Sequence, residues 1–146
     1  FLEFVVECFD HTGANPGDIC FEVTESSVVA NLDHAQRFIA VLHGMGCEFA
    51  LDDFGSGLSS FSTLRTLPMD YLKIDGSFIN NLAGDTVNQA MVAAMIELSR
   101  SLHFRVVAEH VEDQLSLDTV TDMGIDFVQG FWVGRPQPLS MVPNPG

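Results

Sequence analysis

One stretch decides the fold, Phe49-Ala50-Leu51-Asp52-Asp53-Phe54-Gly55-Ser56-Gly57. Its short apolar run predicts a buried strand, which ends abruptly in two adjacent carboxylates and a glycine-rich turn. Adjacent carboxylates repel each other, so Asp52 and Asp53 at the end of an apolar strand are costly unless a cation lies beside them. A divalent metal ion is the simplest candidate for that cation.

Four further segments repeat this pattern of an apolar run that ends in an oxygen-bearing side chain. They are residues 19–25, 71–76, 106–112 and 127–130. In parallel barrels the functional groups gather at the carboxyl ends of the strands, because the loops converge there. We therefore expect five strand ends to contribute to one shared site.

Length and composition describe one globular unit. A chain of 146 residues can bury one core, so we expect one domain or a portion of one. Hydrophobic residues make up 47% and charged residues 18% of the chain, which is typical of a folded protein. The net charge of -14 argues against binding DNA, RNA or an anionic membrane, so an anionic ligand would need a metal ion or a placed cation.

Cysteine usage and hydropathy favour a cytoplasmic location. Cys8, Cys20 and Cys47 lack the CxxC spacing of zinc and redox motifs, which suits a reducing compartment. No apolar run approaches the roughly 18 to 20 residues of a membrane span. The chain begins in what reads as the middle of an amphipathic helix, so we expect it to come from a longer protein that could carry a membrane anchor elsewhere.

Strand-like and helix-like segments alternate along the chain. The expected strands are residues 19–23, 48–52, 71–75, 105–108 and 126–132. The expected helices are residues 1–8, 33–44, 59–64, 86–102 and 113–123, with a helical turn at 78–82. This alternation indicates parallel strands joined by helical crossovers. An eight-unit barrel typically needs about 250 residues, so the five units seen here indicate either a small open sheet or part of a barrel.

Two helices carry features that the structure can test. Asp33 is expected to cap the helix that follows it, and Ser59 or Ser60 the short helix that stops before Pro68. Residues 86–102 carry an apolar stripe that we expect to face the core. Its members are Val87, Ala90, Met91, Ala94, Met95 and Leu98.

Oxygen-bearing side chains at the strand ends predict a site for a hard divalent cation. The candidates are Glu22, Asp52, Asp53, Asp75, Glu109 and Gln129. Magnesium and manganese prefer such ligands. Any single acid at a strand end can equally be a solvated loop residue or a helix cap, but several in register, including an adjacent pair, favour a metal site.

Lys73 lies inside an apolar strand, two positions before Asp75 and therefore on the same face of that strand. Two interpretations of Lys73 stay open. It is either a structural counter-ion for the carboxylates or a group that holds a water or a phosphoryl oxygen. Two-metal phosphoryl chemistry fits this set of residues, and the chain shows no P-loop, GxGxxG motif or serine-histidine-acid set.

A series of motifs in fixed order carries a family resemblance. The motifs are EVTES at 22–26, DDFGSGLSS at 52–60, LPMDYLKIDG at 67–76, VVAEHVE at 106–112, VQGF at 128–131 and Arg135-Pro136. With them the chain resembles the EAL-domain family, the phosphodiesterases of the bacterial messenger cyclic di-GMP. The resemblance implies that residues 1–146 are the C-terminal portion of a single EAL-type phosphodiesterase domain. The implied fold is α/β, a truncated TIM-type (βα)8 barrel with about five parallel βα units.

The resemblance also implies a reaction and a role for individual residues. The reaction is hydrolysis of cyclic di-GMP to linear pGpG, with Mg²⁺ or Mn²⁺ in a two-metal site. The implied metal ligands are Glu22, Asp52, Asp53, Asp75 and Glu109. Lys73 is similar to the residue that positions the nucleophilic water, and Glu109 is the implied general base. The implied substrate-binding or supporting residues are Gln129, Glu25, Glu112, Arg135 and Pro136.

The chain departs from the family pattern in three ways. The Glu-Ala-Leu signature and the asparagine on the following strand are absent, so we expect the chain alone to be a weak or inactive enzyme. His110 replaces the usual glycine after Glu109, which affects the local backbone. Leu58 stands where an aromatic residue is common. Glu25 and the 53–60 loop resemble the part that couples the site to dimerisation, and we expect a homodimer or self-association.

Two other functions stay open. A degenerate family member would bind cyclic di-GMP, or a protein partner, without cleaving the dinucleotide. An unrelated metal-dependent barrel, such as an aldolase or an enolase-like lyase, explains the acids but not Lys73 and Gln129 in their motifs.

Overall fold

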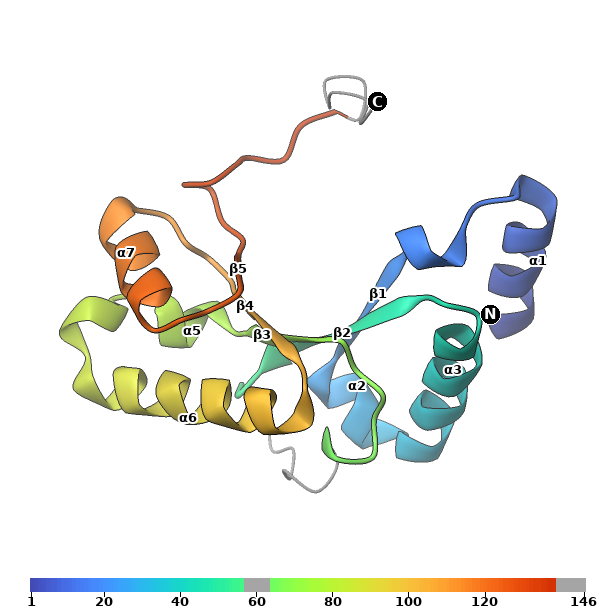
Figure 1. The fold of residues 1–146 in the computed structure, drawn as a ribbon, viewed down its shortest axis with the longest axis horizontal. Helices are drawn as coiled ribbons and strands as arrows, with labels where there is room; N and C mark the ends of the chain where they lie inside the picture. The colour runs from blue at the N-terminus through green and yellow to red at the C-terminus, as the bar shows by residue number, and fades with distance from the viewer. Residues whose placement is uncertain (57–63, 139–146) are drawn as a thin grey trace.

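A five-stranded parallel sheet forms the frame of the molecule. The computed structural model describes residues 1–56 and 64–138. The strands are β1 (Cys20–Thr24), β2 (Glu48–Phe54), β3 (Tyr71–Ile74), β4 (Arg105–Ala108) and β5 (Phe127–Val128). They pair in chain order, all parallel, and β1 and β5 are the edges (Figure 1). Because each strand pairs with the next along the chain, the sheet grows in one direction, as the wall of a barrel does.

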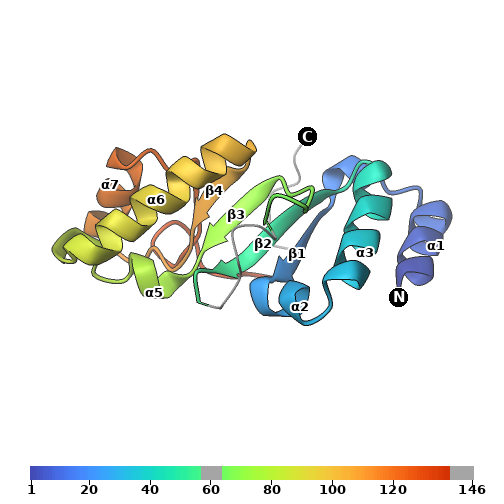
Figure 2. The same cartoon turned by 90° about the horizontal axis from the view of Figure 1, so that it is seen from below.

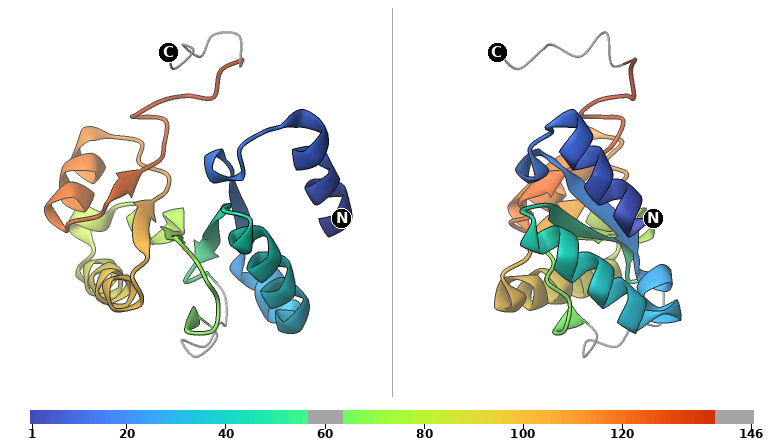
Figure 3. Two further views of the ribbon diagram at one scale, coloured as in Figure 1. Left: turned by 45° about the vertical axis from the view of Figure 1, so that its right-hand side comes forward. Right: turned by 90° about the vertical axis from the view of Figure 1, so that its right-hand side faces the viewer.

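Among the described residues, helices precede β1 and lie between β1 and β2, between β3 and β4 and between β4 and β5. They are α1 (Leu2–Thr12), η1 (Pro16–Asp18), α2 (Glu25–Ala30), α3 (Leu32–Gly44), α5 (Gly76–Ile79), η2 (Leu82–Gly84), α6 (Thr86–Leu102) and α7 (Gln114–Asp122). In Figures 1 and 2, α1 and α3 lie at the β1 end of the sheet, and α6 and α7 at the β5 end. The two groups stand apart on either side of the strands (Figure 3).

The core lies between the sheet and these helices. Strand residues alternate between the two faces, so Phe49, Leu51 and Leu72 are buried in the core. The α3 residues Ile39 and Leu42 pack into the same core. The intervening strand residues point to the opposite face of the sheet, where a hollow of about 160 Å³ is lined by Cys20, Glu22, Ala50, Tyr71, Lys73, Val107 and Gln129.

The buried face of α6 is not the stripe that the sequence indicates. Val87 and Met91 are 65% and 43% exposed, and Met95 is the one stripe residue that is buried. The buried residues of this helix are Val92, Met95, Ile96 and Ser99. These positions also recur at three- and four-residue spacing, so α6 offers two apolar stripes and the sheet covers only one of them.

Helix starts and the last strand also differ from expectation. Asp33 does not cap α3; the side chain of Asn31 does, by accepting a hydrogen bond from His34 N at 3.3 Å. Before α3 lies a separate helix, α2, capped by Thr24, which the sequence reading does not anticipate. β5 ends at Val128 rather than Trp132. The expected caps at Ser59 and Ser60 lie outside the described residues.

The chain turns and packs closely at Gly130, two residues after the end of β5. The chain turns there, with Val133 N donating to Gly130 O at 3.2 Å, and a Cβ at position 130 would overlap backbone atoms of Val111. We expect Gly130→Ala to lower the free energy of unfolding by about 1–3 kcal/mol in urea denaturation. Gly44→Ala is the matched control, because nothing lies within 4 Å of a Cβ built there. Equal stability of the two variants would contradict the close packing of residues 111 and 130.

Candidate active site

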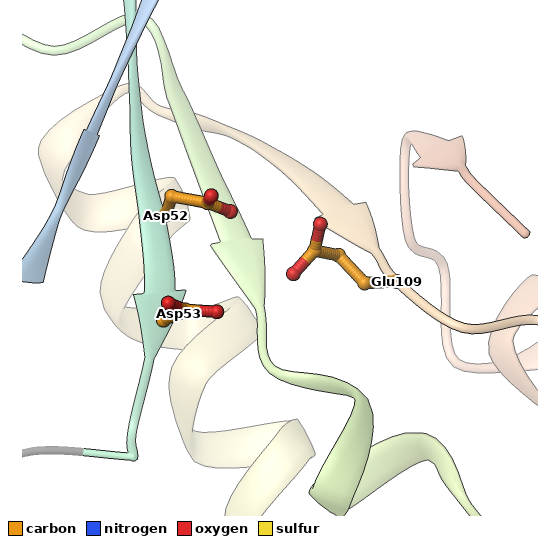
Figure 4. Close-up of side chains that lie close together, drawn as sticks. All are labelled: Asp52, Asp53 and Glu109. Atoms are coloured by element: carbon orange, nitrogen blue, oxygen red, sulfur yellow. The ribbon is translucent and has the colours of Figure 1, made fainter.

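An irregularity in β2 brings two adjacent carboxylates to the same side of the sheet. Regular alternation would send Asp52 and Asp53 to opposite faces. The pairing register of β2 with β3 shifts between Leu51 and Phe54, and Asp53 has a φ of 57°. Figure 4 shows both carboxylates facing Glu109 at the end of β4. One carboxylate oxygen from each of the three residues lies within 4.8 Å of the other two.

Lys73 joins three strands through its ammonium group. Lys73 Nζ lies 2.9 Å from Asp52 Oδ1, 2.9 Å from Glu109 Oε1 and 3.0 Å from Glu22 Oε1. The Lys73 side chain is only 5% exposed. Burial lowers the pKa of Lys73, but its three close carboxylate partners, Glu109 first among them, together outweigh burial and raise the pKa above the ordinary lysine value. Lys73 therefore keeps its proton, and its ammonium group can donate but not accept hydrogen bonds.

The same carboxylates fit a divalent metal ion. Asp52, Asp53 and Glu109 offer only oxygen ligands, which magnesium and manganese prefer. Asp52 Oδ1 is buried and, within the described residues, its ion pair with Lys73 falls short of hydrogen-bond geometry. A buried carboxylate oxygen without a hydrogen bond has lone pairs available to a cation.

Glu109 is the most strongly buried carboxylate of the three. Its side chain is 9% exposed. Burial raises the pKa of Glu109, and Lys73 offsets only part of that increase. Glu109 therefore keeps its proton to a higher pH than an exposed glutamate does.

The pH dependence of metal affinity should reflect the raised pKa of Glu109. A metal ion has to displace the Glu109 proton, so we expect Mn²⁺ affinity to rise with pH above the ordinary glutamate range, about pH 4.3, and to level off above the raised pKa. Calorimetric titrations across this window measure the affinity. Glu109→Gln should bind Mn²⁺ more weakly and with a flatter pH profile, whereas an unchanged profile would exclude Glu109 as the titrating ligand.

Three other residues expected at the site occupy different positions. The Glu22 side chain is 52% exposed and pairs with Lys73. Glu25 is buried at the start of α2, and its Oε2 accepts a hydrogen bond from Gly55 N at 3.0 Å, which ties this helix to the loop after β2. Asp75 accepts a hydrogen bond from Ser77 N at 2.8 Å as the cap of α5. Neither Glu22 nor Asp75 belongs to the three-carboxylate cluster found among the described residues.

A cavity of about 640 Å³ adjoins Glu109 at the ends of β4 and β5. Its lining includes the expected residues Glu112, Gln129, Arg135 and Pro136, together with Glu109, His110, Gly130, Phe131 and Gly134. Phe131 also lines the cavity, and the guanidinium carbon of Arg135 lies 4.7 Å from its ring centroid. The sequence gives Phe131 no role of its own, although its place at the end of the VQGF motif is the signal that could have indicated one.

The chain is similar to known proteins over most of its length. Cyclic di-GMP phosphodiesterase PdeB of Shewanella oneidensis is 43% identical over 122 residues, which cover 84% of this chain and 14% of PdeB. The PaMucR phosphodiesterase, solved as a c-di-GMP complex, matches with a TM-score of 0.89 and 37% identity over 95% of this chain and 56% of that one. Klebsiella pneumoniae BlrP1, solved as a manganese/cy-diGMP complex, matches with a TM-score of 0.82 and 29% sequence identity. The match covers 89% of this chain and 33% of the BlrP1 chain.

These matches confirm the α/β fold with five parallel strands that the sequence predicts, as part of a TIM-barrel-like architecture. The model of the EAL domain matches residues 1–136, from α1 past the end of β5. Since this match takes in every described strand and the whole carboxylate cluster, the chain belongs to the EAL domain family.

Proposed function

We propose that the protein hydrolyses cyclic di-GMP to linear pGpG with a divalent metal ion. The observation that carries the proposal is the buried Lys73 ammonium, held within 3.0 Å of carboxylates from β1, β2 and the end of β4. This arrangement puts a fixed positive charge beside a set of metal-binding oxygens, which suits chemistry on a phosphodiester. The relative PdeB is named a cyclic di-GMP phosphodiesterase.

Asp52, Asp53 and Glu109 would hold the metal ion, with Glu22 and Asp75 as further proposed ligands. The metal ion, Mg²⁺ or Mn²⁺, would supply a lowered water pKa and charge neutralisation at the phosphate. BlrP1 was solved with manganese.

The protein's own side chains would orient the attacking water, accept its proton and position the substrate. Lys73, which stays protonated, donates a hydrogen bond that orients the attacking water. Glu109, whose pKa burial raises, accepts the proton that this water loses. The water oxygen forms a bond to phosphorus while the bond from phosphorus to the ribose 3′ oxygen breaks, and the 3′ oxygen gains a proton from solvent and becomes a hydroxyl. Gln129, Glu112, Arg135 and Pro136 would position the substrate in the adjoining cavity, and Glu25 would support the loop after β2.

Product analysis tests this proposal. The full-length protein that carries this sequence is incubated with cyclic di-GMP and Mg²⁺ or Mn²⁺, and pGpG is quantified by chromatography, with EDTA as the control. Metal-dependent release of pGpG is the expected result. Calorimetric binding of cyclic di-GMP without any pGpG would instead identify a degenerate binding module, and the absence of both would reject the proposal.

We also propose a location and an assembly state. No helix in residues 1–56 and 64–138 has the length and apolar character of a membrane span, and the cysteines Cys8, Cys20 and Cys47 are free. The free cysteines support a cytoplasmic location for this part of the protein. The open edge at β1 and the exposed Phe1 and Phe4 support self-association. Light scattering that found only monomer at high concentration would contradict the latter.

A further inference from the structure

His110 is a residue that the proposed mechanism does not use. Its φ is 54°, in the left-handed region that glycine favours and that other residues rarely adopt. The His110 side chain is exposed and lines the cavity beside Glu109. Backbone strain retained at a functional cavity suggests that the side chain itself has a use there.

Gly76 leaves the space that the His110 ring occupies. A Cβ at position 76 would overlap Nδ1, Cγ and Cβ of His110. The backbone at Gly76 does not have a positive φ, so the reason for glycine there is space and not conformation. The imidazole is therefore seated against the first residue of α5, at the edge of the cavity.

The rest of the cavity suits a flat group with polar edges. Phe131 and Pro136 supply apolar surface, and the Arg135 guanidinium lies over the Phe131 ring. Gln129 and Glu112 add polar atoms to the same lining. The volume of about 640 Å³ is that of an ordinary small-molecule site. A nucleobase has the matching chemistry, because its faces stack on rings and its edges form hydrogen bonds.

We propose that His110 is a ligand-contacting residue whose ring packs against a nucleobase of the cyclic dinucleotide. This inference rests on the proposed function, because it takes the cavity beside Glu109 as part of the substrate site. The phosphates of the dinucleotide would lie toward Lys73 and the metal ligands, and the base toward His110, Phe131 and Arg135. His110 thus adds a contact that the glycine usual at this position does not provide.

Calorimetric titration of cyclic di-GMP into the full-length protein, with EDTA to prevent turnover, tests the contact. We expect His110→Gly and His110→Asn to weaken binding about tenfold, the scale of one lost ring–base stack. His103→Gly is the matched control, because His103 is also exposed and has a φ of 63°, at the C-terminal end of α6. Both glycine variants should raise the unfolding temperature, because glycine adopts a positive φ without strain. Only the change at position 110 should alter the affinity for cyclic di-GMP.

A second variant tests the position of the ring. Gly76→Ala should displace the imidazole and weaken binding to a similar degree. In the His110→Gly background the same Gly76→Ala change should add nothing, because there is no ring left to displace.

The outcomes separate this inference from the proposed function. If the affinity of His110→Gly for cyclic di-GMP lies within twofold of the wild type, the role of His110 is overturned and the proposed function stays intact. The same conclusion follows if the His110→Gly and Gly76→Ala changes weaken binding independently. A wild-type protein that neither binds nor cleaves cyclic di-GMP would overturn both.

Discussion

Replacing Lys73 with methionine should lower the free energy of unfolding by about 3–5 kcal/mol in EDTA, the cost of breaking a buried ion pair by removing one partner. The methionine keeps most of the volume of the lysine stem, so the effect comes from charge. Without the ammonium, the buried Glu109 and Asp52 carboxylates repel each other, and no other lysine or arginine within residues 1–56 and 64–138 pairs with them. The half-exposed Glu22 contributes less, because solvent screens it.

A divalent metal ion should restore part of this stability. Mn²⁺ binds the same carboxylates, so the increase in unfolding temperature on adding Mn²⁺ should be larger for Lys73→Met than for the wild type. Activity should stay at least about 100-fold below the wild type even with metal, since the donor that orients the water is gone.

Arg100→Met is the matched control for this experiment. Arg100 also pairs with a carboxylate, Glu97, at 2.8 Å, but the two side chains are 57% and 74% exposed. Such surface pairs contribute about 0–1 kcal/mol. Urea denaturation with and without Mn²⁺ measures both variants. A Lys73→Met protein as stable in EDTA as Arg100→Met would show that the Lys73 contacts do not hold the strands together.

The sequence predicts those parts of the fold that depend on local signals. The bounds of α6 and β4 match the expected residues 86–102 and 105–108, because Asp85 caps the helix start and His103 adopts the left-handed conformation that ends it. The face that α6 buries could not be predicted in the same way. Two apolar stripes satisfy the helical period, and tertiary packing against the sheet selects between them.

The site shows the same division between local and tertiary information. Strand ends in a parallel sheet meet at one edge, so the convergence of Asp52, Lys73 and Glu109 follows from the alternation of strands and helices. The local break in β2 at Asp53 does not follow from this alternation. Asp53 has a φ of 57°, but nothing in the sequence distinguishes it from an aspartate in a regular strand. The capping role of Asp75 is likewise visible only once α5 is in place.

Replacing Asp52 with asparagine should separate metal binding from folding. The amide keeps the shape of the side chain but removes the charge that faces both Lys73 and the metal position. We expect Mn²⁺ affinity to fall at least about 100-fold, since loss of partners that only support the ligands already costs 10–100-fold. Production of pGpG should fall with it.

Stability in EDTA should change far less for Asp52→Asn than for Lys73→Met. Two carboxylates still surround the ammonium after the Asp52 change, so no buried charge is left alone. Removing Asp52 also removes one charge that raises the pKa of Glu109, so the rise of Mn²⁺ affinity should begin at lower pH in the variant. Calorimetry and urea denaturation measure the two properties, and Asp10→Asn, on the exposed side of α1, controls for charge alone. Unchanged Mn²⁺ affinity in Asp52→Asn would mean that the metal ion binds elsewhere, and the chemistry built on Asp52, Asp53 and Glu109 would fail with it.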